Sequence, residues 1–99
     1  MRNIKIDFVA VESQARQLEE IAEGIRRLAE RKMTGTIESM AAIWEGESAD
    51  AYFSKAELVK QELLKTSSGL YDVASNVRAQ AKKIYEAERR AIEQTQTTK

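Results

Sequence analysis

Few residues in this sequence could support catalysis, and the carboxylates of Glu19, Glu20 and Glu23 form the densest group among them. Three carboxylates this close together could bind a divalent cation or exchange protons with a substrate. The same spacing also fits a solvated helix face, because Arg16 and Arg27 stand four residues from Glu20 and Glu23 and can pair with them. We favour the second interpretation, since it needs no further ligand.

Most catalytic chemistry lacks its usual side chains here. The sequence contains no histidine and no cysteine, so the commonest general base and the thiolate nucleophile or metal ligand are excluded. It also has no Gly-x-Ser-x-Gly motif, no Ser-x-x-Lys motif with its partner motifs and no Gly-rich phosphate loop. We therefore expect no catalytic residue, no cofactor, no metal ligand and no enzymatic activity.

The charge pattern gives no general attraction to nucleic acid or to an anionic membrane, because the formal net charge is zero. Two basic pairs, at residues 82–83 and 89–90, could bind an acidic partner, but glutamates are interspersed among them. A solvated, mixed-charge face is the simpler interpretation. We expect neither nucleic-acid binding nor membrane insertion, since no segment approaches the 18 or so apolar residues of a membrane span.

The N-terminal sequence is not that of a conventional signal peptide. It has an early arginine but no apolar run of about 7 to 15 residues and no small-residue cleavage site. A protein of this kind that leaves the cell is expected to do so without a classical leader.

Two long helical patterns must position whatever this chain presents. Apolar residues recur at steps of three and four and predict a helix over residues 8–43, with Asp7 as its N-cap and Ile6 and Val11 as a hydrophobic staple. The same rhythm predicts a second helix over residues 49–93, followed by a polar tail at 94–99 that is expected to fray.

The only residues that favour the end of one helix and the start of the next lie between these helices, in the stretch IWEGES at residues 43–48. Gly46 can adopt the left-handed conformation that closes a helix, and Ser48 can cap the next one. The single tryptophan, Trp44, therefore lies in a turn at about 44–48. The whole chain, 1–99, is predicted to be one all-α domain, an antiparallel two-helix hairpin.

The hairpin pattern also predicts a register. If residue 42 lies opposite 49, Gly24 comes level with residues 67 and 68, and Gly35 with Ala56. The two glycines either permit close approach of the helices or are tolerated at an exposed site or kink. The end of the second helix, from Ile84 onward, would extend beyond the first, where residues 4–6 or a partner chain could cover it.

A rod of two helices leaves much of its apolar surface exposed, so we expect two hairpins to pair into a four-helix bundle. The residues expected at this dimer or partner interface share the apolar stripes of the two helices. They are Leu18, Ile25, Leu63, Leu70, Val77 and Ile84.

The chain length, the two helices and the central Trp44-Glu45-Gly46 turn resemble the Trp-x-Gly hundred-residue family, which includes proteins of the early secretory antigen type. The resemblance covers essentially the whole chain. It implies a helical hairpin that forms homodimers or heterodimers and is exported by the type VII pathway of Gram-positive bacteria and mycobacteria, with the secretion ATPase as a partner. It also assigns Trp44 and Gly46 to a secretion-related surface where the turn meets the end of a second helix.

The family often carries a further export signal, Tyr-x-x-x-Asp/Glu, near the C-terminus. Here Tyr85 is followed by Arg89 at the fourth position, and the acid, Glu88, comes one residue early. Positions three and four apart lie near one another on a helix, so Tyr85 and Glu88 form a degenerate version of the signal.

Three interpretations of function therefore stay open. The first is a secreted homodimeric substrate. The second is a small partner that covers the N-terminal helical domain of a larger LXG-type toxin and helps to target it, in the manner of a chaperone. The third is a cytosolic coiled-coil adaptor unrelated to secretion.

Overall fold

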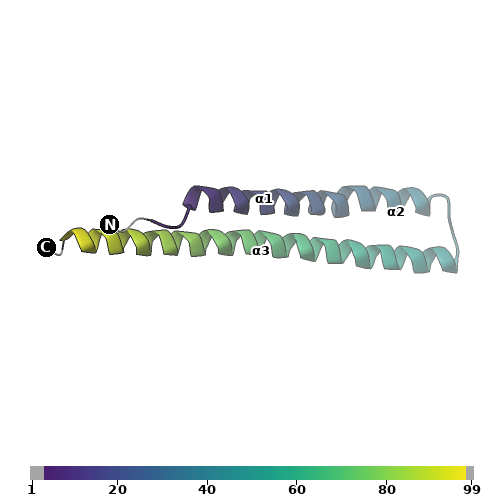
Figure 1. The fold of residues 1–99 in the computed structure, drawn as a ribbon. Helices are drawn as coiled ribbons and strands as arrows, with labels where there is room; N and C mark the ends of the chain where they lie inside the picture. The colour runs from purple at the N-terminus through teal and green to yellow at the C-terminus, as the bar shows by residue number, and fades with distance from the viewer. Residues whose placement is uncertain (1–3, 98–99) are drawn as a thin grey trace.

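The computed structural model describes residues 4–97, and within them the chain forms two long helical arms and no strand (Figure 1). The first arm consists of α1 (Phe8–Arg27), the π-helical segment η1 (Leu28–Met33) and α2 (Thr34–Ala41). The second arm is a single helix, α3 (Glu47–Thr97). The arms run antiparallel in a rod of 82 × 16 × 12 Å. The predicted all-α helical hairpin is confirmed.

The first arm begins as its sequence predicts. The side chain of Asp7 accepts a hydrogen bond from the backbone N–H of Ala10 at 3.0 Å, and its carbonyl accepts one from Val11 at 3.0 Å. Two amides that would otherwise lack a helical partner are thereby satisfied. Ile6 and Val11 line the same groove, as expected for a hydrophobic staple.

The turn differs from its prediction in detail. The first arm ends at Ala41, and the Ile43 N–H donates to the Met40 carbonyl at 3.1 Å, which tightens the last turn without a left-handed residue. Gly46, at φ 116°, accepts instead from the Asp50 N–H at 3.0 Å. Gly46 thus opens α3 rather than closing the first arm. Ser48 lies inside the first turn of α3, so the prediction that it caps the helix is wrong.

The polar end of the chain is helical for as far as it is described. α3 continues to Thr97, four residues beyond the predicted end at about 93, and the fraying of the tail stays a prediction. The Thr95 hydroxyl donates to the Ala91 carbonyl at 2.9 Å, one turn earlier, which occupies a side chain that could otherwise compete with the helical backbone. Residues 98 and 99 of that tail lie outside the described part.

The π-helical segment η1 corrects a slip in the apolar repeat of the first arm. Val11, Leu18 and Ile25 are spaced by seven residues, but the next apolar residue in this series is Met33, eight residues on. A π-helical turn accommodates one extra residue, so the apolar side chains after it return to the same face. The Thr34 hydroxyl donates to the Ala29 carbonyl at 3.5 Å across this wider turn.

Small residues form the contact between the arms. The buried residues of the described chain are six alanines and one serine, and most of them recur every seven residues on each arm. We call the following set the small-residue seam: Ala15, Ala22, Ala29, Ser67, Ala74 and Ala81. The Ser67 hydroxyl donates to the Ala22 carbonyl at 2.7 Å across the seam, in agreement with the predicted register.

The two glycines expected near the contact lie outside it. Gly24 and Gly35 are exposed, and a Cβ built on either would meet no heavy atom within 4 Å. The hypothesis that they permit close approach of the two arms is therefore wrong, and the alternative of exposed, tolerated glycines holds within the hairpin. Alanines allow the close approach of the two arms instead, and they lose less conformational entropy in a helix than glycines do.

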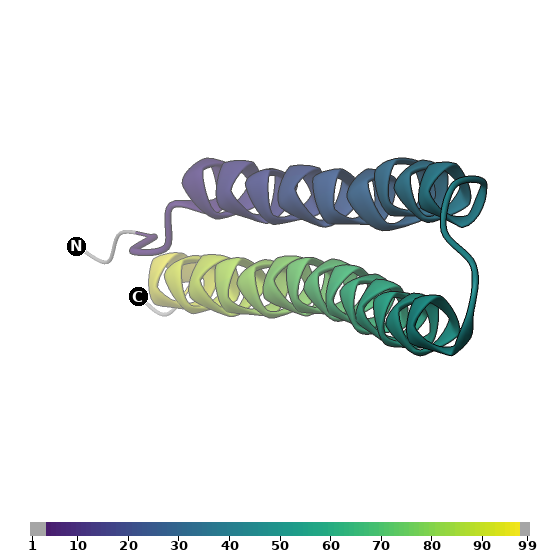
Figure 2. The ribbon, with the colours of Figure 1, turned by 90° about the vertical axis from the view of Figure 1, so that its right-hand side faces the viewer.

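The overhang of α3 is covered by the segment that precedes α1, as one of the two expectations had it (Figure 1). The backbone amides of Lys5 and Ile6 donate to Glu88, and the ring of Phe8 packs against Tyr85. Elsewhere the two arms form a single pair of helices, with no third element of the described chain over either side (Figure 2).

The seam predicts a strong position effect for one substitution. Ala74→Leu inserts a large side chain where the arms touch and should cost about 1–3 kcal/mol of unfolding free energy. Ala51→Leu makes the same change at an exposed position of the same helix and should stay within about 0.5 kcal/mol of the parent. Urea denaturation followed by circular dichroism, at one fixed protein concentration, measures both. Equal effects of the two substitutions would show that the seam is not the tight contact described.

Candidate functional site

One side of the hairpin is closed by ion pairs between the arms. The Arg78 guanidinium donates to Glu19 at 2.7 and 2.6 Å and to Glu12 at 2.8 Å. These hydrogen bonds hold the pKa of the Glu19 carboxyl below its ordinary value of 4.5 and raise the pKa of Arg78 above its own. Together with Glu23 and Tyr71, these residues define what we call the closed flank.

Glu23 is the most heavily bonded carboxylate on the closed flank. Arg26 donates to it at 2.8 Å, Arg27 at 3.4 Å, and the Tyr71 hydroxyl at 2.7 Å from the other arm. The Arg26 hydrogen bonds, followed by that of Tyr71, lower the pKa of Glu23 from 4.5 to about 2. The bond to Glu23 raises the pKa of Tyr71 in turn.

The carboxylates of Glu19 and Glu23 therefore serve the fold. Glu19 and Glu23 are engaged by Arg78, Arg26 and Tyr71, which leaves little of either carboxylate for a cation. Across residues 4–97 no group of three or more His, Cys, Asp or Glu side chains converges on a common point. The interpretation as a paired helix face fits this geometry.

The opposite side of the hairpin carries exposed apolar side chains, and we call it the open flank. Its members are Ile21, Leu28 and Ile43 from the first half of the chain and Tyr52, Val59 and Val73 on α3, with exposed fractions from 43% to 86%. On α3 they recur at multiples of seven residues. On the first half the spacing of 15 residues from Leu28 to Ile43 is two heptads plus the residue inserted by η1.

No charged residue occurs at the repeat positions of the open flank. The remaining positions of the two series are Gln14, Thr36, Thr66, Gln80 and Ala87. Charged residues make up 32% of the chain, so a series of eleven uncharged positions marks a face set apart from the rest of the surface. Exposed apolar residues that recur along one face, interrupted only by uncharged residues, favour a protein interaction site.

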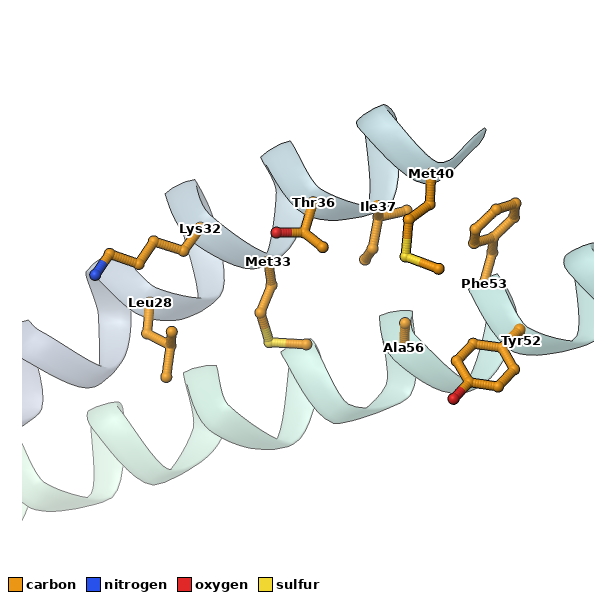
Figure 3. Close-up of a pocket in the computed structure, with 9 residues that line it drawn as sticks. All are labelled: Leu28, Lys32, Met33, Thr36, Ile37, Met40, Tyr52, Phe53 and Ala56. Carbon is orange, nitrogen blue, oxygen red and sulfur yellow. The ribbon is translucent and has the colours of Figure 1, made fainter. Parts of the chain in front are cut away.

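Near the turn, the open flank is hollowed into a groove of about 220 Å³, which we call the turn groove (Figure 3). Met33, Ile37 and Met40 point into it from the first arm, and Tyr52 and Phe53 lie across from them on α3. Lys32 is the only charged residue of its lining. The methionines give this groove an adaptable apolar wall.

A second groove, of about 270 Å³, lies toward the start of α1, and we call it the amino-terminal groove. It is lined by Ile6 and Val11 from the first arm and by residues of α3 that include Val77 and Ile84. None of its lining residues is charged. The open flank therefore carries one groove near each end of the paired region.

The turn places Trp44 against the start of α3. Its ring lies 5.6 Å from that of Tyr52 and 5.8 Å from that of Phe53, the latter in an edge-on arrangement. Trp44 is half-buried, so part of the indole stays accessible. Gly46 is exposed beside it. The two residues thus lie together at one corner of the rod.

Tyr85 and Glu88 lie side by side on α3, beyond the start of α1, and both are half-buried by the N-terminal segment. The turn that holds Trp44 is at the opposite end of the rod (Figure 1). A single hairpin therefore does not bring the two parts of the expected export signal together.

The six residues expected at an interface occupy the positions that alternate with the small-residue seam. Five of them are half-buried, and Ile84 is 46% exposed. Each packs toward the other arm and still leaves part of its side chain at the surface. Their role in binding a partner stays a prediction for Leu18, Ile25, Leu63, Leu70, Val77 and Ile84.

Our interface prediction omitted the open-flank residues Ile21, Leu28, Tyr52, Val59 and Val73. A signal for them was present in the sequence, because Ile21, Leu28 and Val73 each directly precede a seam residue. Tyr52 and Val59 lie in the same seven-residue series as Val73, and no position of the two series is charged. This signal could be read only once the buried stripe was known to consist of alanines rather than of the larger apolar residues.

A rod-like helical hairpin with Trp44 and Gly46 in its turn defines the Trp-x-Gly class of small helical proteins. The chain belongs to the WXG100 family, described as proteins of 100 residues with WXG, whose sequence profile matches residues 3–89. No curated protein and no solved structure gives a significant match.

The family is associated with substrates of type VII secretion, pairs with helical partners and is not known for enzymatic activity. Among residues 4–97, no helix combines the length and apolar character that crossing a membrane requires.

The closed flank predicts a specific acid response. The pKa of Glu23 is lower in the folded chain than its ordinary value of 4.5, so its contribution to stability is present above pH 4.5 and is lost as the pH falls toward about 2. The urea midpoint of Glu23→Gln should therefore fall less than that of the parent over this range. Glu20→Gln, which keeps the Glu23 contacts, should follow the parent. Parallel acid curves for all three proteins would contradict the proposed linkage.

Proposed function

We propose that this chain is a non-enzymatic substrate of a type VII secretion system, leaves the cell without a classical signal peptide and acts as a pair of identical hairpins. Its family membership and its Trp44-Glu45-Gly46 turn support the link to secretion. The observation that carries the pairing is the open flank, an exposed apolar face without charge along its repeat.

A single hairpin buries too little to be self-sufficient. Its buried residues in the described part are alanines and one serine, and every larger apolar side chain keeps some exposure. Hydrophobic stabilisation scales with buried apolar area, at roughly 25 cal/mol per Å². Covering the open flank would convert half-buried side chains into a full core, as in a four-helix bundle.

The arrangement of the open flank suits a second copy of the same chain. The turn groove lies at residues 28–40 of the first arm, and the amino-terminal groove meets that arm at Val11. The level midway between them falls near Gly24. A two-fold axis at this level, perpendicular to the rod, lays each turn groove against the partner's amino-terminal groove, which is the self-complementary arrangement of an isologous dimer.

Two glycines lie close to this midpoint. Gly24 is three residues from Ile21, and Gly69 is four residues from Val73, so the two glycines border the open flank on either side of the Ala22 and Ser67 contact. Each is exposed and has no heavy atom within 4 Å of the place of a Cβ. Their absence of side chains leaves the centre of the face open to close approach by a partner helix.

The export-related surface is proposed to include Trp44 and Gly46 in the turn and Tyr85 and Glu88 on α3. The partly exposed indole and the neighbouring glycine offer an aromatic corner, and the tyrosine and carboxylate offer a second aromatic and acidic patch. The secretion ATPase is the partner expected to bind this surface.

Self-pairing predicts different effects for two similar substitutions. Val73→Glu places a charge on the open flank and should convert the dimer, near twice the chain mass of 11.2 kDa, to monomer. Leu58→Glu makes the same kind of change at an exposed residue of α3 outside the open flank and should stay dimeric. Light scattering coupled to size exclusion measures the mass of each.

A well-folded parent monomer would contradict self-pairing. A loosely folded monomer that becomes ordered only with the N-terminal domain of an LXG-type toxin would favour the targeting partner instead. A protein that stays in the cell, with or without a secretion system, would favour the cytosolic adaptor.

Substitutions of Trp44 can separate its contribution to packing from its proposed role in recognition by the export machinery. Trp44→Phe keeps an aromatic ring beside Tyr52 and Phe53 and should cost less than about 1.5 kcal/mol of unfolding free energy, whereas Trp44→Ala should cost more. We expect both variants to lose export in a host with a type VII system. Quantitative immunoblots of medium and cells, with an ATPase deletion strain as the reference, measure this. Export that follows thermal stability across the variants would show that Trp44 only packs.

A further inference from the structure

The N-terminal segment makes a specific contact with the acidic half of the degenerate export signal. The backbone N–H of Lys5 donates to Glu88 Oε2 at 2.7 Å, and that of Ile6 donates to the same oxygen at 3.3 Å. Two consecutive amides of this non-helical segment thus converge on one carboxylate oxygen. Hydrogen bonds to an ionised acceptor are stronger than neutral ones, so this contact orders the segment.

The start of α1, next to this segment, contacts the aromatic half. The ring of Phe8, the first residue of α1, lies 5.6 Å from the ring of Tyr85 at an interplanar angle of 50°. Tyr85 and Glu88 are both half-buried as a result. Contacts that a partner would need, on the Tyr85 ring and on the Glu88 carboxylate, are therefore already occupied by the chain itself.

The cover can open without unfolding a helix. Asp7 caps α1 through its bond from the Ala10 N–H, so the helix begins on the far side of the covering residues. Residues 4–6 lie outside any helix. In the described part of the chain they are held by the two amide bonds to Glu88 and by the packing of the half-buried Ile4 and Ile6, and the Lys5 bond is exposed to water.

We propose that residues 4–6 are an intramolecular cover of the Glu88 carboxylate in the Tyr85 and Glu88 patch, and that a protein partner binds this carboxylate only after the segment moves away. The inference rests on the proposed function, in which these two residues are read during export. The partner's site would offer hydrogen-bond donors to the Glu88 carboxylate and an apolar or aromatic surface to Tyr85. The population of the uncovered state then limits its apparent affinity.

A proline at position 5 tests the cover while leaving the patch intact. Lys5→Pro removes the N–H that donates at 2.7 Å and keeps both Tyr85 and Glu88. Lys5→Ala removes the same side chain but keeps the N–H, so it is the matched control. In hydrogen exchange of the full chain, the Ile6 amide should be protected in the parent and in Lys5→Ala and should exchange severalfold faster in Lys5→Pro.

Export into the medium of a type VII host is the functional readout. It should rise in Lys5→Pro relative to Lys5→Ala and fall in Glu88→Gln and Tyr85→Ala. Phe8→Leu, which removes the aromatic cover from Tyr85, should change export in the same direction as Lys5→Pro. Circular dichroism melting of each variant shows whether the helices are intact.

The outcomes separate the cover from the proposed function. If Lys5→Pro and Lys5→Ala are exported equally while Glu88→Gln is not exported, the cover is overturned and the signal stands. If Glu88→Gln and Tyr85→Ala are exported like the parent, the signal fails and the cover fails with it. An Ile6 amide that exchanges freely in the parent overturns the cover whatever happens in export.

Discussion

The contact between small residues on the two arms is the constraint on which this structure depends. Alanines recur every seven residues on both arms, and the Ser67 hydroxyl reaches the Ala22 carbonyl across them. Because small side chains fill the seam, the helix axes can approach closely, and the larger apolar residues cannot lie between them. They are displaced to the edges of the contact. The seam therefore decides which side chains remain for a partner.

The two edges of the seam have opposite chemistry, which makes the hairpin one-sided. On the closed flank, Arg78 joins Glu12 and Glu19 across the arms and fixes the register. On the open flank the equivalent positions are uncharged throughout, so no ion pair closes it. The segment η1 keeps this division consistent along the first arm, because its extra residue returns Leu28 and Thr36 to the same face.

The sequence was sufficient for the features that depend on local periodicity. The two arms, the Asp7 cap, the register and the turn around Trp44 follow from spacing and from single-residue preferences, and the structure has them. The sequence was insufficient where two kinds of residue could form the same contact, or where one residue could serve either of two helices. Large apolar residues suggested the contact, but alanines make it, and a glycine that could close one helix opens the next. The π-helical segment was not predicted, because an extra residue in the apolar repeat can be recognised only once the buried positions are known.

The distance between the two parts of the export-related surface gives the proposed pairing a consequence. Within one chain, Trp44 and Glu88 lie at opposite ends of a rod 82 Å long, so they cannot form one site. A two-fold axis at the level of Gly24 carries residue 44 of one copy to the level of residue 4 of the other, where the covering segment meets Glu88. The pair would then have two equivalent composite surfaces, each with a turn from one chain and a covered patch from its partner. Formation of the dimer and movement of residues 4–6 would therefore occur at the same end of the rod, since the turn of the partner chain would lie beside this segment.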